Sequence, residues 1–302
     1  METFVPLYIS NKCDSYCVMC GFNHSNSNLT RKVATIDEIR EQLDIIKNHE
    51  KVSAVCILTG ELFSPSSRME NLKLVCEAIN VAIELGFEKV FFNIGSLSNK
   101  EIDFIKNTVI DLSKIVLSLF QETYDELAYK KFFGLNPEKN AKADFQNRID
   151  TIERWISAGF SKIDIGVLLG FKVVESDIEE LISHALRFIQ YNVETYISTP
   201  RIRNGLVGDN EYRLILNKIH NSVPNAKLII TTREKIEFIN SVIDLVSVVS
   251  PGSSDICPYN RGQYISNSNL TSQFVIDEKR LRPFDVLTRI NVDGLIQYFN
   301  VN

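Results

Sequence analysis

Several features of membrane, secreted and nucleic-acid-binding proteins are missing from this sequence. It has no apolar run of about 18 residues or more, so we expect no transmembrane helix. Residues 1–10 lack the basic flank and long apolar stretch of a signal peptide. Six cysteines in 302 residues are too few for a disulfide scaffold, and a net charge of −5 argues against binding to nucleic acid. We therefore expect a protein of the reducing cytoplasm, with neither a membrane nor nucleic acid as its partner.

The sequence does contain a regular alternation of short β-type runs and longer helical runs. The helical runs repeat their apolar residues with a period near 3.6. Such alternation indicates parallel strands joined by right-handed helical crossovers, and eight strands predict an α/β fold of the (βα)8 TIM-barrel type. The expected strands are residues 4–10, 54–59, 89–94, 115–120, 162–169, 194–200, 227–232 and 246–250, and the clearest expected helices are residues 36–48, 69–85, 145–158, 178–191 and 211–220.

We expect a single domain over residues 1–302, in which residues 251–302 form a C-terminal loop and helix that close the barrel. Active sites of such barrels lie at the carboxyl ends of the strands. The segments rich in reactive or polar side chains all follow predicted strands, so we expect them to meet at one mouth. They are residues 13–20, 59–61, 121–124, 201–203, 233–234 and 251–253.

The most specific pattern in the chain is the C-x3-C-x2-C spacing of Cys13, Cys17 and Cys20. Three thiolates on a short loop can hold three irons of a [4Fe–4S] cluster and leave the fourth iron open to a small molecule, whereas electron-transfer clusters are held by four cysteines. The alternative is a Cys3His zinc site that includes His24. Zinc ribbons usually have two C-x2-C pairs, however, and this sequence has one.

This cysteine loop resembles that of the radical S-adenosylmethionine (SAM) superfamily. The resemblance implies that SAM binds at the open iron and is cleaved reductively, which gives methionine and a 5′-deoxyadenosyl radical. Thr59, Gly60 and Glu61 follow the next strand and look like the motif that binds the methionine amino group. Glycine lets the backbone approach closely, and carbonyl and carboxylate oxygens accept hydrogen bonds from an ammonium group.

Three further residues are predicted to contact the cofactor around its adenine. Ile165 and Gly166 lie in the fifth predicted strand, where a small residue beside apolar ones could support the ring. The alternative for Gly166 is that it only permits tight packing of the barrel. Met19 precedes the third cysteine, where an aromatic residue is usual, and we expect its side chain to pack against adenine.

Glu122 and Tyr124 are the predicted catalytic residues after the fourth strand, and Glu122 is also expected to contact the cofactor. The alternative is that both belong to an ordinary helix N-terminus, where acidic residues are common. Three arginines also follow strands, and a guanidinium group can hold a carboxylate through two hydrogen bonds. We assign Arg201 to cofactor binding and Arg203 to substrate binding. Arg233 is favoured for substrate binding and is also a predicted catalytic residue.

The last predicted strand and the loop after it complete the expected mouth. Ser250 and Ser253 are expected to border the substrate.

Taken together, the motifs resemble the aromatic amino-acid lyase branch of the radical SAM enzymes, which includes tyrosine lyases of thiamine biosynthesis and [FeFe]-hydrogenase maturation and the tryptophan lyase of nosiheptide biosynthesis. The resemblance implies hydrogen abstraction from the amino nitrogen of tyrosine or tryptophan, cleavage or rearrangement of a carbon–carbon bond, and a flavodoxin- or ferredoxin-type electron donor. It also assigns the substrate carboxylate to Arg233. The matching segments are residues 6–26, 58–61, 121–124, 162–166, 199–203, 231–234 and 273–277.

Two alternatives remain at this point. Residues 251–264 depart from the Pro-Gly-Gly-Tyr loop of the branch, which leaves open a radical SAM lyase or mutase that acts on another amino acid or a secondary metabolite. Met19, in the place of an aromatic residue, leaves open a non-catalytic barrel that binds only an iron–sulfur cluster or zinc.

Overall fold

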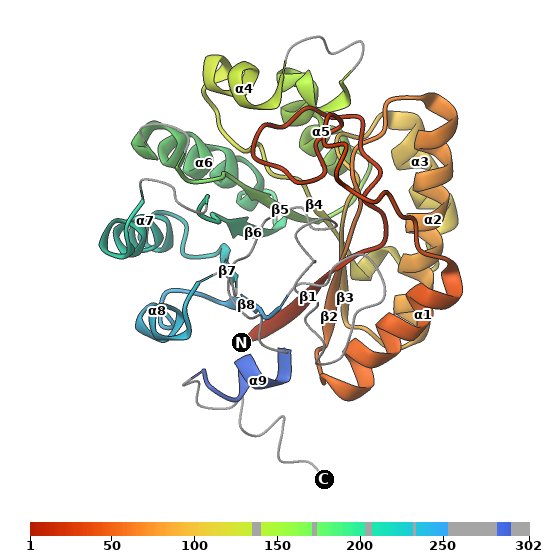
Figure 1. Ribbon diagram of the computed structural model, residues 1–302. Coiled ribbons are helices and arrows are strands. Elements are labelled where there is room, and N and C mark those ends of the chain that lie inside the picture. The colour runs from red at the N-terminus through yellow and green to blue at the C-terminus, as the bar shows by residue number, and fades with distance from the viewer. Residues whose placement is uncertain (135–139, 171–173, 203–206, 232–233, 253–282, 291–302) are drawn as a thin grey trace.

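A closed barrel of eight parallel strands forms the centre of the protein, as the computed structural model shows (Figure 1). The structure describes residues 1–134, 140–170, 174–202, 207–231, 234–252 and 283–290. Strands pair in chain order, and β8 closes on β1 through Glu2–Val248 and Thr3–Val249. This confirms the predicted fold class. The strands are β1 Glu2–Tyr8, β2 Ala54–Leu58, β3 Lys89–Asn93, β4 Ile115–Ser118, β5 Lys162–Gly166, β6 Glu194–Ser198, β7 Lys227–Thr231 and β8 Val248–Ser250.

Helices surround the barrel, and local sequence signals define where several of them begin. The side chains of Thr35 and Ser98 each accept a hydrogen bond from the backbone amide of the glutamate three residues later. That glutamate's carboxylate accepts one from the backbone amide of Thr35 or Ser98, so α1 and α3 both start with a capping box. The five clearest predicted helices correspond to α1, α2, α5, α6 and α7. The helices are α1 Ile36–Asp44, α2 Pro65–Glu84, α3 Asn99–Thr108, α4 Glu126–Phe133, α5 Phe145–Ser157, α6 Val174–Ile189, α7 Asp209–Ser222, α8 Ile236–Ser241 and α9 Pro283–Leu287, with a π-helix Ile45–His49 and 3-10 turns Leu112–Lys114 and Ala141–Ala143.

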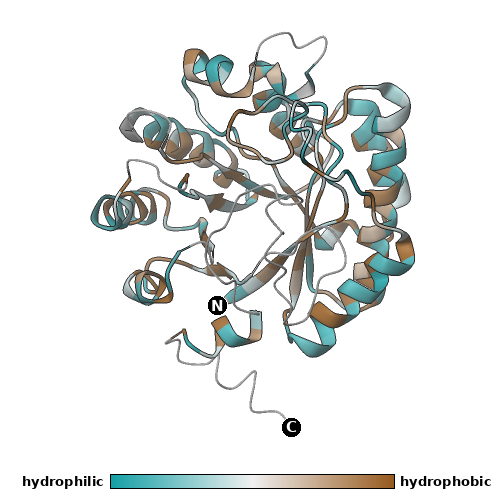
Figure 2. Cartoon of the chain, viewed as in Figure 1, coloured by the Kyte–Doolittle hydropathy of each residue, from teal (hydrophilic) through white to brown (hydrophobic). Residues whose placement is uncertain are grey.

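Two hydrophobic layers follow from the alternation of side chains along each strand. Outward-facing residues of the strands pack against the helices in one large outer core. Inward-facing residues form a second, smaller apolar cluster inside the barrel, which includes Phe91, Val116, Ile229 and Val248. Figure 2 shows hydrophobic colour along the strands, while the helices carry both hydrophobic and hydrophilic residues.

The amino-terminal end of the barrel is closed by charged side chains. The Tyr196 hydroxyl lies 2.8 Å from a carboxylate oxygen of Glu2 and 2.8 Å from one of Glu194, and its single proton is shared between them. Lys89 and Lys227 each pair with the same two carboxylates. Burial would raise the pKa of Glu194, but hydrogen bonds from the two lysines outweigh it and lower the pKa to about 2. The opposite end of the barrel, where the strands finish, is therefore the end left for a site.

The short helix α9 packs beside α8 and the end of the π-helix. The Phe284 amide donates to the Glu50 carboxylate at 3.2 Å, and Asn240 donates to the Arg289 carbonyl at 3.2 Å. Most of residues 251–302 lie outside the described residues, so the expected closing role of this segment stays a prediction. None of the helices within the described ranges has the length and apolar character required to span a membrane.

Candidate active site

The three cysteines lie on the long loop that follows β1, and hydrogen bonds hold this loop in place of regular secondary structure. The Asp14 amide donates to the Glu61 carbonyl at 2.8 Å, which ties the loop to the end of β2. The Val18 amide donates to the Phe132 carbonyl at 3.0 Å, which ties it to α4. The Arg31 guanidinium donates to three carbonyls of the loop, among them that of Asn23 at 2.7 Å. The cysteines are therefore fixed at the carboxyl end of the barrel.

The three thiols lie in mostly apolar surroundings beneath the loop. Cys17 packs with Tyr129 and Phe133 of α4, and Cys20 contacts this group as well as the cluster of Tyr8, Phe22 and Leu29. Burial raises the pKa of all three thiols, that of Cys17 to about 12, and neighbouring thiols add to the shift of Cys17 and Cys20. A buried thiolate needs a neighbouring cation to compensate its charge. Iron supplies that charge, and its binding displaces the thiol proton. The donor set therefore fits a [4Fe–4S] cluster.

The proposed zinc alternative depends on His24, which lies at the surface. Its side chain is 51% exposed, and Nδ1 lies 3.3 Å from the Cys13 carbonyl oxygen and 3.8 Å from Asp14. Among the residues that the structure describes, no three His, Cys, Asp or Glu side chains form a group that could hold a single metal ion. A cluster differs in this respect, because each cysteine binds a different iron.

Gly60 allows the end of β2 to lie directly against the cysteine loop. A Cβ atom at this position would lie 2.4 Å from the Lys12 carbonyl oxygen and 2.5 Å from the Cβ of Cys13. The neighbouring Thr59 hydroxyl accepts a hydrogen bond from Asn71 of α2 at 2.9 Å. The predicted Thr59–Glu61 motif thus lies in contact with the predicted cluster ligands.

A buried ion network next to these segments joins two predicted residues to two that the sequence did not reveal. Arg148 of α5 pairs with Glu61 at 2.7 Å and lies 3.7 Å from Glu122. Lys142 pairs with Glu122 at 2.5 Å. Arg148 also donates to the Phe120 carbonyl at 2.5 Å, and its side chain is 1% exposed. The spacing of Lys142 and Arg148 in the sequence matches no motif. Only the packing of α5 and of the preceding 3-10 turn across the barrel end identifies them.

The positive charges of this network stabilise the ionised form of its carboxylates. Burial would raise the pKa of Glu61, but the charges of Arg148 and Lys142 outweigh it and lower the pKa below its usual value. The same carboxylates raise the pKa of both Lys142 and Arg148 against the opposing effect of burial. Glu61 Oε2 is buried and has no hydrogen-bond partner in the described structure. That oxygen is available to a donor from a ligand.

Glu122 adopts a left-handed backbone conformation with φ of +72°, which is uncommon for a residue with a side chain. Its amide donates to the Gly166 carbonyl at 3.3 Å, and its carbonyl accepts from Leu168 at 2.8 Å. These bonds and the ion pair with Lys142 hold the strained residue in place. Strain of this kind concentrates at functional sites.

Three predicted site residues have side chains that point to other parts of the fold. The Tyr124 hydroxyl lies 2.6 Å from His184 Nδ1 of α6, and its ring packs against the outer core. Ile165 faces outward into the same core. Arg201 pairs with Glu234 and with Asp209 at 2.8 Å. These placements do not support a catalytic Tyr124, an adenine contact by the Ile165 side chain or an unpaired Arg201. Tyr124 is bonded to His184, Ile165 is packed in the outer core and Arg201 is paired with carboxylates.

The remaining predicted residues divide into those near the mouth and those that the structure does not describe. Met19 packs with the Cys17 cluster rather than standing free. A Cβ atom at Gly166 would lie 2.1 Å from the Ser198 carbonyl oxygen, so the tight-packing explanation of this glycine is the one that the geometry favours. Ser250 ends β8 and is buried. Three predicted residues lie outside the described residues, namely Arg203, Arg233 and Ser253.

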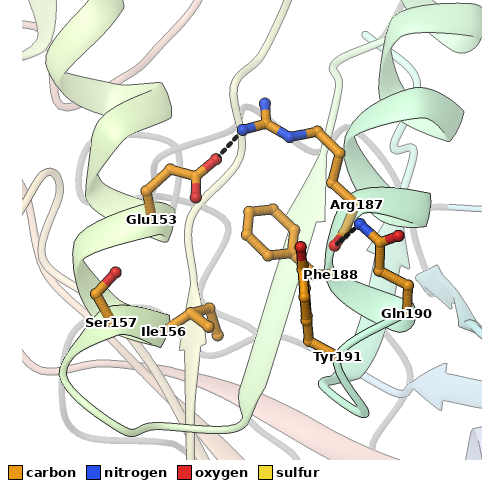
Figure 3. Close-up of a pocket in the computed structure, with 7 residues that line it drawn as sticks. All are labelled: Glu153, Ile156, Ser157, Arg187, Phe188, Gln190 and Tyr191. Carbon is orange, nitrogen blue, oxygen red and sulfur yellow. Dashed lines mark hydrogen bonds and ion pairs between the residues drawn. The ribbon is translucent and has the colours of Figure 1, made fainter.

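A cavity of about 280 Å³ also lies on the outside of the barrel, between α5 and α6 (Figure 3). Glu153 and Arg187 form an ion pair across it, and Ile156, Phe188 and Tyr191 contribute to its lining. The carboxyl ends of both helices form this cavity, so it lies at the amino-terminal end of the barrel, away from the cysteines. We assign it no role in the site.

The barrel, the three-cysteine loop and the adjoining ion network together define the class of this protein. The family model of the radical SAM superfamily matches residues 7–185, and the chain belongs to that superfamily. Enzymes of this superfamily use a [4Fe–4S] cluster and SAM, so this protein is a radical SAM enzyme with those cofactors. The resemblance inferred from the cysteine loop is confirmed.

More particular relatives place the chain within the superfamily. It is 25% identical to 2-iminoacetate synthase of Escherichia coli strain K12, over 97% of this chain and 75% of that protein. It is also 25% identical to the FeFe-hydrogenase maturase HydG from Carboxydothermus hydrogenoformans, with a TM-score of 0.78, over 93% of this chain and 64% of that one. The chain thus spans less than two thirds of the maturase. Methylornithine synthase PylB, at 18% identity and a TM-score of 0.71, shares the fold.

Proposed function

We propose that this protein is a carbon–carbon lyase that abstracts hydrogen from an aromatic L-amino acid, tyrosine or tryptophan. The observation that carries the proposal is the contact between the buried cysteine loop and the end of β2, which the Asp14–Glu61 hydrogen bond and the Gly60 approach create. The similarity to 2-iminoacetate synthase supports the choice of reaction. When bound, the cofactors supply the 5′-deoxyadenosyl radical that abstracts the hydrogen.

The residues of this chain have separate tasks in the proposed reaction. Cys13, Cys17 and Cys20 hold the cluster. Glu61 accepts a hydrogen bond from the SAM ammonium group, for which its unpartnered Oε2 is suited. Arg148 and Lys142 keep Glu61 and Glu122 ionised and hold them in place at the mouth through ion pairs. Because ions in this buried site are poorly screened, their attraction is stronger than it would be in water.

For the substrate, we propose that Arg233 binds the carboxylate and that Arg203, Ser250 and Ser253 border the amino acid. Ser250 is the member of this set that the structure describes, and its hydroxyl is buried without a hydrogen-bond partner there. The support for Arg233 is its position directly after β7, one strand away from the end of β8.

The electron that starts the reaction must enter from a partner, and we propose a flavodoxin- or ferredoxin-type protein. The ligand loop itself offers a contact for such a donor, since Val18, between Cys17 and Cys20, is 64% exposed, and Tyr16 is 41% exposed. Reduced flavodoxin should therefore support turnover in place of dithionite. Changing Val18 to Glu should slow the reaction with flavodoxin and leave the rate with dithionite unchanged.

The cysteine assignment is tested by replacing Cys13, Cys17 or Cys20 with alanine, with Cys76→Ala as the matched control. Cys76 is a buried thiol of α2 in the outer core. After anaerobic reconstitution, we expect each ligand variant to lose the cluster, measured as bound iron and sulfide, and to form no 5′-deoxyadenosine. The control should keep both. Unchanged iron content in the ligand variants would contradict the assignment.

The substrate assignment is tested by incubating the reconstituted protein with SAM, dithionite and either tyrosine or tryptophan. We expect one of the two amino acids to increase the yield of 5′-deoxyadenosine and to give a fragmented or rearranged product by mass spectrometry. Equal yields with and without either amino acid would refute the aromatic substrate, while cluster binding would remain established by the cysteine variants.

A further inference from the structure

Lys142, in the 3-10 turn before α5, lies between the ion network and the cysteine loop. Its ammonium group pairs with Glu122 at 2.5 Å and lies 4.9 Å from the centre of the Phe133 ring. Phe133 packs in one buried group with Cys17 and Tyr129. The Lys142 carbonyl accepts a hydrogen bond from the Tyr129 hydroxyl at 2.6 Å, which holds the turn against the same group. The positive charge is therefore fixed beside the apolar surroundings of Cys17.

The charge of Lys142 acts on the thiol of Cys17. Burial is the largest influence on the pKa of Cys17 and raises it, and the charge of Lys142 is the strongest influence that lowers it. Glu122 acts on the same thiol in the opposite direction, but more weakly than Lys142. The ion pair of Lys142 and Glu122 therefore presents its positive side to Cys17.

The other two cysteines are compensated in a different way. Cys13 and Cys20 each accept a hydrogen bond at 3.4 Å from the backbone amide two residues further along the chain. No amide in the described ranges donates to the sulfur of Cys17. The reduction potential of an iron–sulfur cluster depends on the net charge around it, on hydrogen bonds to its sulfurs and on its exposure to solvent. Lys142 thus provides at Cys17 the positive field that amides provide at the other two ligands.

We propose that Lys142 raises the reduction potential of the cluster and so favours its reduction by the electron donor. A single electron passes from a flavodoxin- or ferredoxin-type donor to the oxidised cluster, and the ammonium group keeps its proton. Reduction adds negative charge in a buried place, where a fixed cation offsets more of the cost than it would in water. The inference goes beyond the proposed function, because no amino-acid substrate takes part in this step.

The test is a redox titration of the anaerobically reconstituted protein, monitored by electron paramagnetic resonance, without SAM or amino acid. Lys142→Met removes the charge and keeps an unbranched side chain. We expect its equilibrium constant for reduction to fall by about tenfold or more, which lowers the potential by about 59 mV or more for one electron. Lys142→Arg keeps the charge and should stay near the wild-type potential.

Lys106→Met is the matched control for the loss of a lysine charge. Lys106 lies in the last turn of α3 and donates to the Ala158 carbonyl at 3.0 Å, so it is at the amino-terminal end of the barrel, away from the cysteines. The potential of this variant should equal that of the wild type. A shift as large as that of Lys142→Met would show that the position of the charge is unimportant, and would overturn the proposal.

Removal of Lys142 also leaves the Glu122 carboxylate without its partner, and a second pair of variants separates that effect. Glu122→Gln is compared with the double variant Glu122→Gln/Lys142→Met, which has no carboxylate at this position. The double variant should have the lower potential. Equal potentials within this pair, at equal cluster content, would overturn the proposal. Loss of the cluster from both methionine variants would also contradict it, because Lys142 would then be needed to build the site.

Discussion

Individual side chains at the carboxyl end of the barrel lie where burial of charge is costly, and they offset that cost in pairs. Glu61 and Arg148 are both almost completely buried, at 7% and 2% exposure. Removing one member of such a pair leaves the other charge without compensation. The site therefore depends on Arg148 for stability as well as for the binding proposed above.

Replacing Arg148 separates these two contributions. Arg148→Ala should lower the free energy of unfolding by about 3–5 kcal/mol, because Glu61 stays buried without its partner. Arg148→Lys keeps the charge but loses part of the hydrogen bonding to Glu61 and Phe120, so we expect a stable protein with weaker SAM binding. Chemical denaturation and equilibrium dialysis with SAM measure the two effects. Wild-type SAM affinity in Arg148→Lys would contradict a role in cofactor binding.

Tyr124 shows how a residue beside the mouth can serve the fold. Its hydroxyl bonds to His184, and burial lowers the pKa of that histidine to about 4. The amide of Tyr124 also donates to Asp177 at 2.7 Å. Tyr124 therefore fixes the segment after β4 to α6, which in turn holds its neighbour Glu122 at the mouth.

Among the structural elements, the end of β2 and the cysteine loop form the most sensitive contact. Their separation is set by the missing side chain of Gly60. The loop is held by turns and by its contacts with neighbouring segments rather than by a helix or strand, so displacement of the end of β2 should move the thiols.

Gly60→Ala should therefore impair cluster binding although it replaces no ligand. The added methyl group overlaps the Lys12 carbonyl and Cys13, and overpacking of this kind costs about 1–3 kcal/mol. We expect reduced iron content after reconstitution and a proportional loss of SAM cleavage. Gly208→Ala is the matched control, because a Cβ at Gly208 meets nothing within 4 Å. Equal iron content in both variants would show that the contact is dispensable.

Across the whole molecule, the two ends of the barrel have opposite tasks. The ion cluster around Tyr196 closes the amino-terminal end, while the carboxyl end carries the cysteine loop and the ion network. Between them lies the apolar filling of the lumen, with the buried carboxyl group of Asp164 of β5 beside it. The stability of the entire barrel consequently depends on the protonation of that carboxyl.

Burial raises the pKa of Asp164 to about 7, against hydrogen bonds from Ser118 and Ser198, and this shift predicts how stability varies with pH. Below pH 3.8 the carboxyl is protonated in both the folded and unfolded states, and above about pH 7 it is ionised in both. Between these values only the unfolded chain releases the proton, so the free energy of unfolding falls as pH rises, by a total on the order of 4 kcal/mol. Asp164→Asn lacks this loss and should gain stability relative to the wild type between pH 5 and pH 8.

Urea denaturation of both proteins at several pH values, with cluster content measured in parallel, checks this expectation. A difference in stability that does not change with pH would show that Asp164 keeps an ordinary pKa. The outcome is independent of the substrate experiment, because it concerns the folded and unfolded states alone.

The sequence by itself determined the barrel and the cluster loop. Alternating periods of apolar residues predict the eight strands and their parallel order, and the spacing of Cys13, Cys17 and Cys20 identifies the superfamily. Both are local signals, which a short stretch of chain contains completely.

Only the tertiary structure decided which polar side chains meet. It brought Arg148 and Lys142 to Glu61 and Glu122, directed Tyr124 to His184, and enclosed Asp164 between two serines. These partners are far apart in the sequence, and no periodic pattern relates them. Packing of the helices on the barrel determines which charged or hydrogen-bonding groups lie within reach of a long side chain. These partners therefore come together only when the barrel has closed.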